Sequence, residues 1–447
     1  MAPRPALDRR LSRLASALDP AWLEAQRWYR AKSQRIAKVE LVDAAPIDRH
    51  AWLLVLGATN VSGGVSRYLV PAIVDDDAFR EPRDGEGVWR AIASLIVAGG
   101  ELDAARGSWV FAPTPTLGEL LPGGAGELAS VGERRLGVQQ SNTSVAFADR
   151  LMLKVYRLLE PGANPEVEVG VFLTTVGFAQ APAVAGSATY LLDGEPHSAA
   201  LLQQFMPSAG DAWSWLLGHL IGSPGVGAEA IAGVEQIGDL TARMHAALAS
   251  RPTTPGFPSR VATSGELADW RSAAGGQLDG ALAALHGAPR MRLAAIAPLI
   301  DGGLDSITSA REVRVSRIHG DYHLGQLLRT ETGFMVIDFE GEPARTPAER
   351  GAPASRLRDI AGMLRSLDYA AHSAIEAGAS PDGMPGWLLE ARAAFLDGYG
   401  GIDPDDRSLL AAFELEKACY EVHYEADNRP DWVWLPLEAL ERLALAG

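Results

Sequence analysis

The sequence predicts a mixed α+β protein in which strands dominate the first half and helices dominate the second. Before Pro207, runs with alternating or continuous β-rich character, such as KVELVDA and LMLKVYRLL, are separated by polar and Gly-rich turns. After Pro207, long apolar runs such as EAIAGVEQIGDLTARMHAALA have helical spacing. The chain has 447 residues, too many for one ordinary core, so two or three structural units are expected.

The first predicted domain covers residues 1–90. A helix from Asp8 to Trp28 precedes three strand candidates, KVELVDA, AWLLVLGA and SRYLVPAIV. A short apolar helix, WRAIASLIVAGG, then ends at glycine. The Pro- and Gly-rich stretch APTPTLGELLPGGAGE is predicted to be a loop or a boundary.

The second predicted domain, residues 91–206, is expected to be a small antiparallel sheet. RRLGVQQ, VAFADR and LMLKVYRLL are predicted to be three consecutive strands, with SNTS as the first turn. The helix NPEVEVGVFLTTVG follows them, with Asn164 at its cap and Pro165 in its first turn. ATYLLDG and SAALLQQFM return to strand.

The third predicted domain, residues 207–447, is expected to be mainly helical. One segment interrupts the helices: HGDYHLGQLLRTETGFMVIDFEGEP, which begins at His319. The net charge of −16 argues against a general nucleic-acid or membrane-surface binder, which usually needs a basic face. The single cysteine, Cys419, excludes an internal disulfide and a cysteine-based zinc site.

The N-terminus carries arginines without an apolar stretch behind them, which is a poor signal peptide. The sequence contains no apolar run near the ~20 residues needed to cross a bilayer. We therefore expect a soluble, cytoplasmic protein.

The segment at His319 allows two chemistries. His319, Asp321 and His323 alternate and so form a candidate metal cluster of a hydrolase, although the other histidines are scattered singly. In the other chemistry, Asp321 takes the proton of an attacking hydroxyl, while Gln326 and Asp338 hold Mg²⁺. Kinase catalytic loops have this order of an acid, an amide five residues later and a strand ending in Asp. His319 is then expected to support the loop, and His323 either supports it or contacts a sugar.

A nucleotide site needs other residues, and the sequence lacks the G-x-x-x-x-G-K-[ST] motif of P-loop enzymes. The polar turn between the first two strands would present hydroxyls and N–H groups to phosphates, although an ordinary hairpin turn has the same composition. Lys154 lies in an apolar strand, where it is either a snorkelling edge lysine or the group that binds the α- and β-phosphates with an acid from the next helix. Glu166 and Glu168 are both available. The turn residues are Ser141, Asn142, Thr143 and Ser144, and by position alone the adenine would be held between Gln203 and Met206.

The helical segment FELEKACYEVHYEADNRPDW is the candidate acceptor site. Glu416, Tyr420 and Tyr424 are spaced i, i+4, i+8 and so form one stripe. Acids suit sugar hydroxyls or an ammonium, and aromatic rings suit the apolar face of a sugar. Trp432 and Trp434 would close such a pocket. The alternative is an amphipathic helix with a solvated acidic side.

HGDYHLGQ followed by VIDFEGEP resembles the aminoglycoside-phosphotransferase-like kinases, and within them the maltokinase-like group of actinobacteria, which includes glucosamine kinases. Stretches such as QQSNTSVAFADRLMLKVYRLLEPGANPEVEV and SRLRDIAGMLRSLDYAA extend the resemblance over most of the chain. It implies a bilobal protein-kinase-like fold with an N-terminal cap domain, a β-rich nucleotide-binding lobe and a helical C-terminal lobe. It also implies ATP and Mg²⁺ as cofactors, and it favours Glu168 as the partner of Lys154.

The chain departs from the family pattern in three places. Gln326 stands where small-molecule kinases usually have Asn, and Glu340 stands where protein kinases have Gly, adding a further metal ligand or substrate contact. RWYRAKSQ near the N-terminus resembles, without matching, the RWF-x-x-K-type stretch of maltokinases, which disfavours maltose.

Taken together, the residues and the resemblance predict an ATP- and Mg²⁺-dependent sugar kinase that converts glucosamine to glucosamine 6-phosphate, with Asp321 as general base. One alternative is a maltokinase that makes maltose 1-phosphate. The other is a catalytically silent kinase-like nucleotide-binding module, against which the presence of both Asp321 and Asp338 argues. The expected partners are ATP and a small sugar, without nucleic acid or membrane, and the expected state is a monomer or weak dimer.

Overall fold

The computed structural model describes residues 18–29, 35–75, 78–137, 142–222, 227–342 and 345–446. The chain forms two compact units: Met1–Pro207 with Thr346–Ala348, and Ser208–Arg345 with Glu349–Gly447. Whether the first unit divides again near residue 90 stays a prediction. Within the described helices, none is both long and apolar enough to span a membrane.

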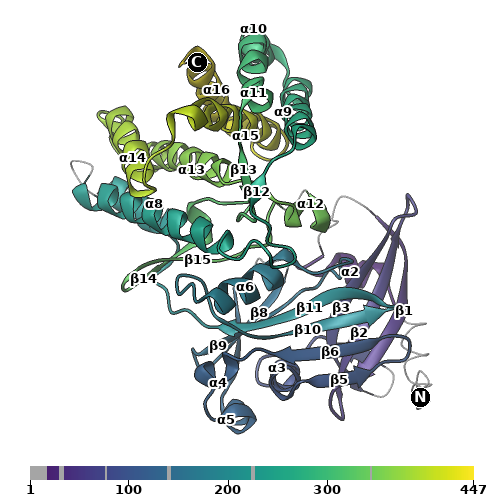
Figure 1. The fold of residues 1–447 in the computed structure, drawn as a ribbon. Helices are drawn as coiled ribbons and strands as arrows, with labels where there is room; N and C mark the ends of the chain where they lie inside the picture. Colours follow the sequence, from purple (N-terminus) through teal and green to yellow (C-terminus); the bar gives the residue numbers. More distant parts are fainter. Residues whose placement is uncertain are drawn as a thin grey trace. The chain divides into compact units, whose positions relative to one another are not determined.

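The first unit contains two antiparallel sheets (Figure 1). A four-stranded sheet runs in the order β1 (Ile36–Pro46), β2 (Ala51–Asn60), β3 (Val65–Asp75) and β4 (Ala78–Arg80). A seven-stranded sheet runs in the order β5 (Gly100–Asp103), β6 (Ser108–Pro113), β10 (Val184–Leu192), β11 (Glu195–Gln204), β9 (Leu151–Val155), β8 (Thr143–Phe147) and β7 (Glu133–Leu136).

Strand β2 of the four-stranded sheet is buried on both faces, which explains why it is a continuous apolar run rather than an alternating one. Leu54 and Leu56 belong to a core with Trp28 and Tyr29, whereas Leu53 and Val55 belong to a second core. This second core also includes Trp89 of helix α3 (Val88–Ala98), together with residues of the seven-stranded sheet. The four-stranded sheet is thus sandwiched between the first aromatic residues of the chain and the rest of the unit.

The helices of the first unit agree with the predictions at some positions and correct them at others. Helix α6 begins as predicted, because the Asn164 side chain accepts a hydrogen bond from the Glu166 N–H and Pro165 opens the helix. The stretch predicted to be a loop contains the short helices α4 and α5, and the hairpin β5–β6 was not predicted. Most of the helix expected from Asp8 to Trp28 lies outside the described residues. The helices are α2 (Pro20–Glu24), α3 (Val88–Ala98), α4 (Leu117–Leu120), α5 (Gly124–Ser130) and α6 (Pro165–Val176).

The second unit is mainly helical, as predicted (Figure 1). The helices after Pro207 are α7 (Ala212–Gly222), α8 (Ala228–Leu248), α9 (Ser264–Ala284), α10 (Gly287–Leu304), α11 (Ser306–Ser309), α12 (Pro347–Gly351), α13 (Leu357–Glu376), α14 (Met384–Gly398), α15 (Arg407–Asn428) and α16 (Trp434–Ala446), with 3₁₀ turns η1 (Leu324–Gln326), η2 (Pro404–Asp406) and η3 (Pro430–Trp432). A three-stranded sheet contains β12 (Arg260–Val261), β13 (Arg314–Ser316) and β16 (Ala354–Ser355), and a hairpin contains β14 (Leu327–Thr330) and β15 (Gly333–Val336).

Two glycines let α8 and α14 approach closely. A Cβ atom on Gly238 would lie 2.1 Å from the Phe395 carbonyl oxygen, and one on Gly398 would lie 2.1 Å from the Glu235 carbonyl oxygen. Alanine at either position would therefore push the two helices apart. This contact matters for the segment at His319, because α8 supplies Thr241, which hydrogen-bonds to the Tyr322 hydroxyl (2.8 Å), and His245, which contacts a carboxylate that holds the segment.

Candidate active site

The loop that follows β13 is held by a buried carboxylate from α13. Asp359 accepts hydrogen bonds from the backbone N–H groups of His319 (2.8 Å) and Gly320 (2.9 Å), and its Oδ2 lies 3.0 Å from His245 Nε2. Burial alone would raise the pKa of Asp359, but its contact with His245 and the hydrogen bond from the Gly320 N–H lower that pKa. Asp359 therefore fixes the loop as an anion, a role that was not predicted for it.

His319 supports the same loop, as expected. Its Nδ1 accepts a long hydrogen bond from the Asp321 N–H (3.4 Å), so Nε2 carries the proton and donates to the Ile337 carbonyl (2.9 Å). The ring also packs beside Phe339, with 4.9 Å between ring centroids. His319 thus joins the backbone of Asp321 to the residue that precedes Asp338.

The predicted metal residues come from neighbouring segments of the second unit. Ile337 donates its N–H to the Gln326 carbonyl (3.0 Å), so Gln326 and Asp338 lie at the same end of the β14–β15 hairpin. Asp338 has a positive φ of 64°, which turns the chain sharply after the strand. Carboxylate oxygens of Asp338 and Glu340 lie within 4.8 Å of each other. Two carboxylates and an amide are the oxygen ligands that Mg²⁺ prefers, so this donor set fits the predicted ion.

His323 is part of the loop support. Its Nδ1 accepts a hydrogen bond from the Gly325 N–H (3.1 Å) and so caps the 3₁₀ turn that ends at Gln326. Burial lowers the pKa of His323, against the opposing charge of Asp321. The expectation left open whether His323 supports the loop or contacts a sugar. The hydrogen bond favours loop support. Because His323 also lines a cavity, a contact with a sugar stays a prediction.

A cavity of about 690 Å³ lies within the second unit and brings the predicted acceptor residues together. Asp321 and His323 come from the loop, and Glu416, Tyr420 and Tyr424 come from α15. The rings of Tyr420 and Tyr424 stack, with centroids 6.3 Å apart. Among the described residues that line this cavity, neither Trp432 nor Trp434 is present, so the structure gives no support to their predicted closing role.

Lys417 is a cavity residue that was not predicted. Its Nζ lies 3.9 Å from Asp321 Oδ1, 3.5 Å from Glu342 Oε1 and 4.7 Å from the centroid of the Tyr420 ring. Burial would lower the pKa of Lys417, but Glu342 and Asp321 outweigh burial and raise it. The sequence did contain a signal for Lys417, because it is a single cation between Glu416 and Tyr420 in a mostly apolar and acidic helix. Lys417 lies next to the predicted stripe and beside the predicted base.

Glu416 already has a partner, which changes the interpretation of the acidic stripe. Both of its carboxylate oxygens accept hydrogen bonds from Arg358 Nη1, at 3.0 and 2.9 Å. The Arg358 guanidinium in turn lies 4.4 Å from the centroid of the Phe413 ring. Glu425 is likewise paired with Arg429 and accepts a hydrogen bond from the Tyr369 hydroxyl. The stripe is neither a solvated acidic face nor a row of unpaired acids.

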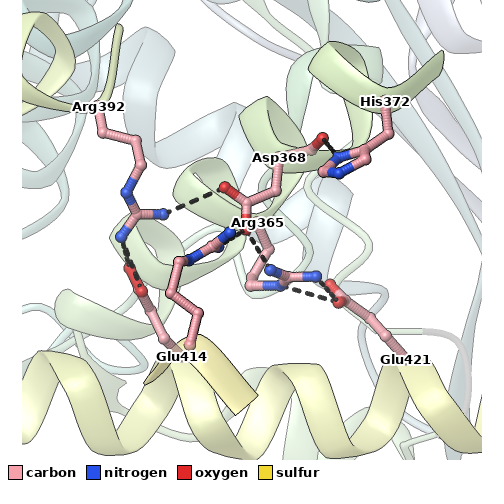
Figure 2. A network of polar contacts seen from close by, with 7 residues as sticks. Arg365, Asp368, His372, Arg392, Glu414 and Glu421 are labelled. Atoms are coloured by element: carbon pink, nitrogen blue, oxygen red, sulfur yellow. Dashed lines mark hydrogen bonds and ion pairs between the residues drawn. The ribbon is translucent and has the colours of Figure 1, made fainter. Parts of the chain in front are cut away.

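Behind the cavity, arginines compensate the buried acids of α15 (Figure 2). Arg365 Nε and Nη2 donate to Glu421 Oε2 at 2.9 and 2.7 Å, and Arg392 donates to both oxygens of Glu414 at 2.8 Å. Asp368 lies between them and accepts from Arg365 and Arg442, with Arg392 Nη1 at 3.6 Å. We call this set the arginine network; its members are Arg365, Asp368, Arg392, Glu414, Glu421 and Arg442.

In the first unit, Lys154 pairs with a different acid from the one favoured. Its Nζ lies 2.7 Å from Glu166 Oε2, which also accepts a hydrogen bond from the Tyr156 hydroxyl (2.8 Å). The resemblance favoured Glu168, so this is a correction. The reason is helical phase: Glu166 is on the buried stripe with Val169, whereas Glu168 is two residues along and only partly buried.

The predicted turn is mostly strand. Ser141 lies outside the described residues, and Asn142 is the last residue before β8, which begins at Thr143. Thr143 is opposite Val155, and Ser144 is opposite Lys154. The Thr143 hydroxyl accepts a hydrogen bond from Arg157 Nε (2.8 Å). Lys154 therefore has its cross-strand neighbour within the predicted phosphate-binding residues.

The predicted adenine-binding segment leaves the seven-stranded sheet. Gln203 lies in β11 opposite Met152 and is largely buried, whereas Met206 follows the strand and is partly exposed. Backbone N–H groups of the two intervening residues are used, since Gln204 donates to Ala183 (2.8 Å) and Phe205 donates to Arg150 (2.8 Å).

Comparison with known proteins gives matches along nearly the whole chain. The family model described as "Phosphotransferase enzyme family" matches residues 132–379, and the one described as "Maltokinase N-terminal cap domain" matches residues 22–86. A glucosamine kinase of Streptacidiphilus jiangxiensis is 30% identical over 95% of this chain and 96% of its own length. One of Mycolicibacterium smegmatis is 28% identical over 88% of this chain and 99% of its own length.

Solved structures give the same result. A glucosamine kinase in complex with glucosamine, ADP and inorganic phosphate matches with a TM-score of 0.74 and 25% identity, covering 97% of this chain and 98% of that one. The predicted fold class is confirmed: a kinase-like fold with a strand-rich N-terminal lobe, an N-terminal cap and a helical C-terminal region.

Proposed function

Because this chain belongs to the phosphotransferase enzyme family and is an ATP-dependent phosphotransferase, we propose that it is a glucosamine kinase that produces glucosamine 6-phosphate. The observation that carries the proposal is the cavity of the second unit. Asp321 lies on one wall and the Tyr420–Tyr424 pair of α15 on another, in a chain similar to the glucosamine kinase of Streptacidiphilus jiangxiensis over 95% of its length.

Asp321 is the proposed general base. It would accept the proton of the 6-hydroxyl as that oxygen attacks the γ-phosphate of ATP, and it would orient the hydroxyl before attack. His319 and Asp359 hold the backbone of its loop, and the Lys417 ammonium near Oδ1 favours one orientation of the carboxylate. Gln326, Asp338 and Glu340 would hold Mg²⁺, which supplies positive charge to the phosphates when bound.

The nucleotide would be held by residues of the first unit. Lys154, steadied by Glu166, would bind the α- and β-phosphates. Residues Ser141 to Ser144 would present hydroxyl and N–H groups to phosphate, and the segment from Gln203 to Met206 would bind adenine. These assignments rest on the strand pairing of Lys154 and on the resemblance to the family.

Glucosamine is preferred over maltose because of the charge of the cavity. Eight of the lining residues are Asp or Glu, and five are Lys or Arg. The lining residues therefore include more carboxylates than cationic side chains, which favours a cationic acceptor over a neutral one. Tyr420 and Tyr424 would lie against the sugar ring, and Glu416 with Arg358 would serve its hydroxyls.

A maltokinase is the second candidate, favoured by the match of residues 22–86 to the maltokinase cap. An ADP-release assay over glucosamine, glucose, maltose and aminoglycosides separates the candidates. We expect turnover with glucosamine, and phosphate on O6 of the product. Turnover with maltose alone would overturn the proposal. We further propose a cytoplasmic enzyme that is a monomer or weak dimer in solution, which sedimentation would test.

A further inference from the structure

One continuous stretch of chain makes backbone hydrogen bonds with both sheets of the first unit. Leu151–Val155 forms β9 and carries Lys154 between β8 and β11. Immediately afterwards, the Arg157 carbonyl accepts from the Leu69 N–H (2.7 Å), and the Leu159 N–H donates to the Arg67 carbonyl (2.9 Å). The strand that carries the proposed ATP lysine therefore continues directly onto β3 of the four-stranded sheet.

The Arg157 side chain uses all of its nitrogens at this point. It is 1% exposed, and Nη2 lies 3.0 Å from Glu81 Oε1 while Nη1 donates to the Leu69 carbonyl (3.3 Å). Its Nε donates to the Thr143 hydroxyl at 2.8 Å. The guanidinium also lies 4.9 Å from the Trp28 ring centroid, and Trp28 Nε1 donates to Glu81 (2.8 Å).

The contacts of Arg157 connect the cap segment to the proposed phosphate-binding residues. Glu81, Leu69 and Trp28 all belong to residues 22–86, the segment that matches the cap. Thr143 belongs to the proposed phosphate-binding residues, opposite Val155 and one residue before the partner of Lys154. The planar fork of an arginine can hold two such groups at fixed relative positions, which the single ammonium of a lysine cannot.

We propose that Arg157 is a positioning residue through which the cap sets the place of Thr143 relative to Lys154, and thereby the affinity for the phosphates of ATP. This inference rests on the proposed function insofar as Thr143 and Lys154 lie at the ATP phosphates. It gives the cap a role in nucleotide binding, distinct from the acceptor site.

A second set of polar contacts attaches the four-stranded sheet to the rest of the unit without Arg157. Asp43 in β1 is 0% exposed and accepts hydrogen bonds from the Arg106 N–H (2.9 Å), the Gly107 N–H (2.7 Å) and the Tyr190 hydroxyl (2.7 Å). It ties the same sheet to the β5–β6 turn and to β10. Asp43 makes no hydrogen bond to Thr143, so it is the matched control for a cap attachment without a link to β8.

The experiment compares Arg157→Lys, Thr143→Val, the double variant and Asp43→Asn in the full chain. We would measure the Kd for ATP with Mg²⁺ by calorimetry, the KM values for ATP and glucosamine, and the melting temperature. Arg157→Lys is expected to raise the Kd and KM for ATP about tenfold, the scale of one hydrogen bond to a charged group, and to leave the KM for glucosamine unchanged. Thr143→Val should have a similar effect, and the double variant should be no worse than the stronger single one.

Asp43→Asn should lower the melting temperature and leave the Kd for ATP as in the unaltered protein. The proposal is overturned if Arg157→Lys changes only the melting temperature, or if Asp43→Asn weakens ATP binding equally. Additive effects of Arg157→Lys and Thr143→Val would also overturn it, since the two residues would then act separately. Calorimetry with ATP needs no acceptor, so an incorrect choice of sugar leaves this test intact, whereas an unaltered protein that binds no ATP overturns the proposed function itself.

Discussion

Arg157 in the first unit and Arg365 in the second are each only 1% exposed, and they have very different surroundings. Arg157 has one carboxylate, Glu81, and its other contacts are a hydroxyl, a carbonyl and two indole rings. Burial therefore lowers its pKa to about 10, against the charge of Glu81. Arg365 is just as buried, but Glu421 and Asp368 outweigh burial and raise its pKa.

The contrast separates two uses of a buried guanidinium. At Arg365 the cation compensates acids that line or support the acceptor cavity, so its charge matters most. At Arg157 most of the contacts are directional and neutral, so the geometry of the fork matters most. The first unit thus fixes a strand and a turn with few charged groups, whereas the second unit has many charged groups around its cavity, several of them in ion pairs.

The largest expected effect tests whether the two regions have separable tasks. Asp321→Ala should lower kcat by about a hundredfold to ten-thousandfold, the usual range for loss of a general base, and should leave the Kd for ATP unchanged. Single-turnover kinetics and calorimetry measure the two quantities. Unchanged turnover would contradict the assignment of Asp321 as the base. A large loss of ATP affinity would instead show that the acceptor region also binds nucleotide.

The next effect concerns stability and compares the two arginines directly. Arg365→Met should lower the free energy of unfolding by roughly 3–5 kcal/mol, because Glu421 and Asp368 would remain buried without their cation. Arg157→Met should cost less, about 1–3 kcal/mol, because only one carboxylate loses its partner and Glu81 is partly exposed. Urea unfolding at neutral pH measures both, and equal losses would show that the charge environments do not differ in effect.

The pH dependence of Arg365→Met sharpens the same contrast. Burial already raises the pKa of Glu421 above its ordinary value of 4.5, and Arg365 opposes that rise. Without Arg365 the folded-state pKa rises further, so above 4.5 the folded protein keeps a proton that the unfolded chain has released. The variant should therefore lose stability as the pH rises from 4.5 toward the new folded-state pKa. A deficit that stays constant with pH would contradict this interpretation.

Local sequence signals were sufficient for much of this architecture. Pattern and spacing could identify three features that each depend on residues close together in the chain. These are the helix capping of α6 by Asn164, the hairpin of β8 and β9, and the loop from His319. The kinase-like fold followed from the order of Asp321, Gln326 and Asp338 together with the family resemblance.

The missed features depend on contacts between distant residues. Asp359 supports the loop from 40 residues away, and Arg365 meets Glu421 at a separation of 56 residues. No local pattern specifies which arginine approaches which acid. Sequence spacing alone left both Glu166 and Glu168 open as partners of Lys154, and the family resemblance favoured Glu168. Lys417 was overlooked among the acids that surround it.

A smaller effect tests the corrected partner of Lys154. Glu166→Gln should raise the Kd for ATP about tenfold, because the lysine loses the carboxylate that holds it. Glu168→Gln, two residues along the same helix, is the matched control and should have less effect. Calorimetry with ATP distinguishes them. If the control were the more damaging variant, the family-based expectation would be restored and the apposition of Lys154 and Glu166 would be incidental.

The smallest effect provides the reference for both buried arginines, because it concerns a pair near the surface. Arg260 donates to both oxygens of Glu266, at 2.8 and 2.6 Å, and Glu266 also closes the capping box of α9. The hydrogen bond from Arg260 is the main reason that the pKa of Glu266 falls from 4.5 to about 2. Glu266→Gln should lower the free energy of unfolding by about 1 kcal/mol or less, since solvent screens the pair. Because a lowered pKa stabilises the fold only above the unfolded-state value, this difference should be full above pH 4.5 and vanish as the pH falls toward 2. If the loss of unfolding free energy instead matched that of Arg157→Met, burial would not distinguish Arg157 from Arg260. The case for Arg157 would then depend on its hydrogen bond to Thr143 alone.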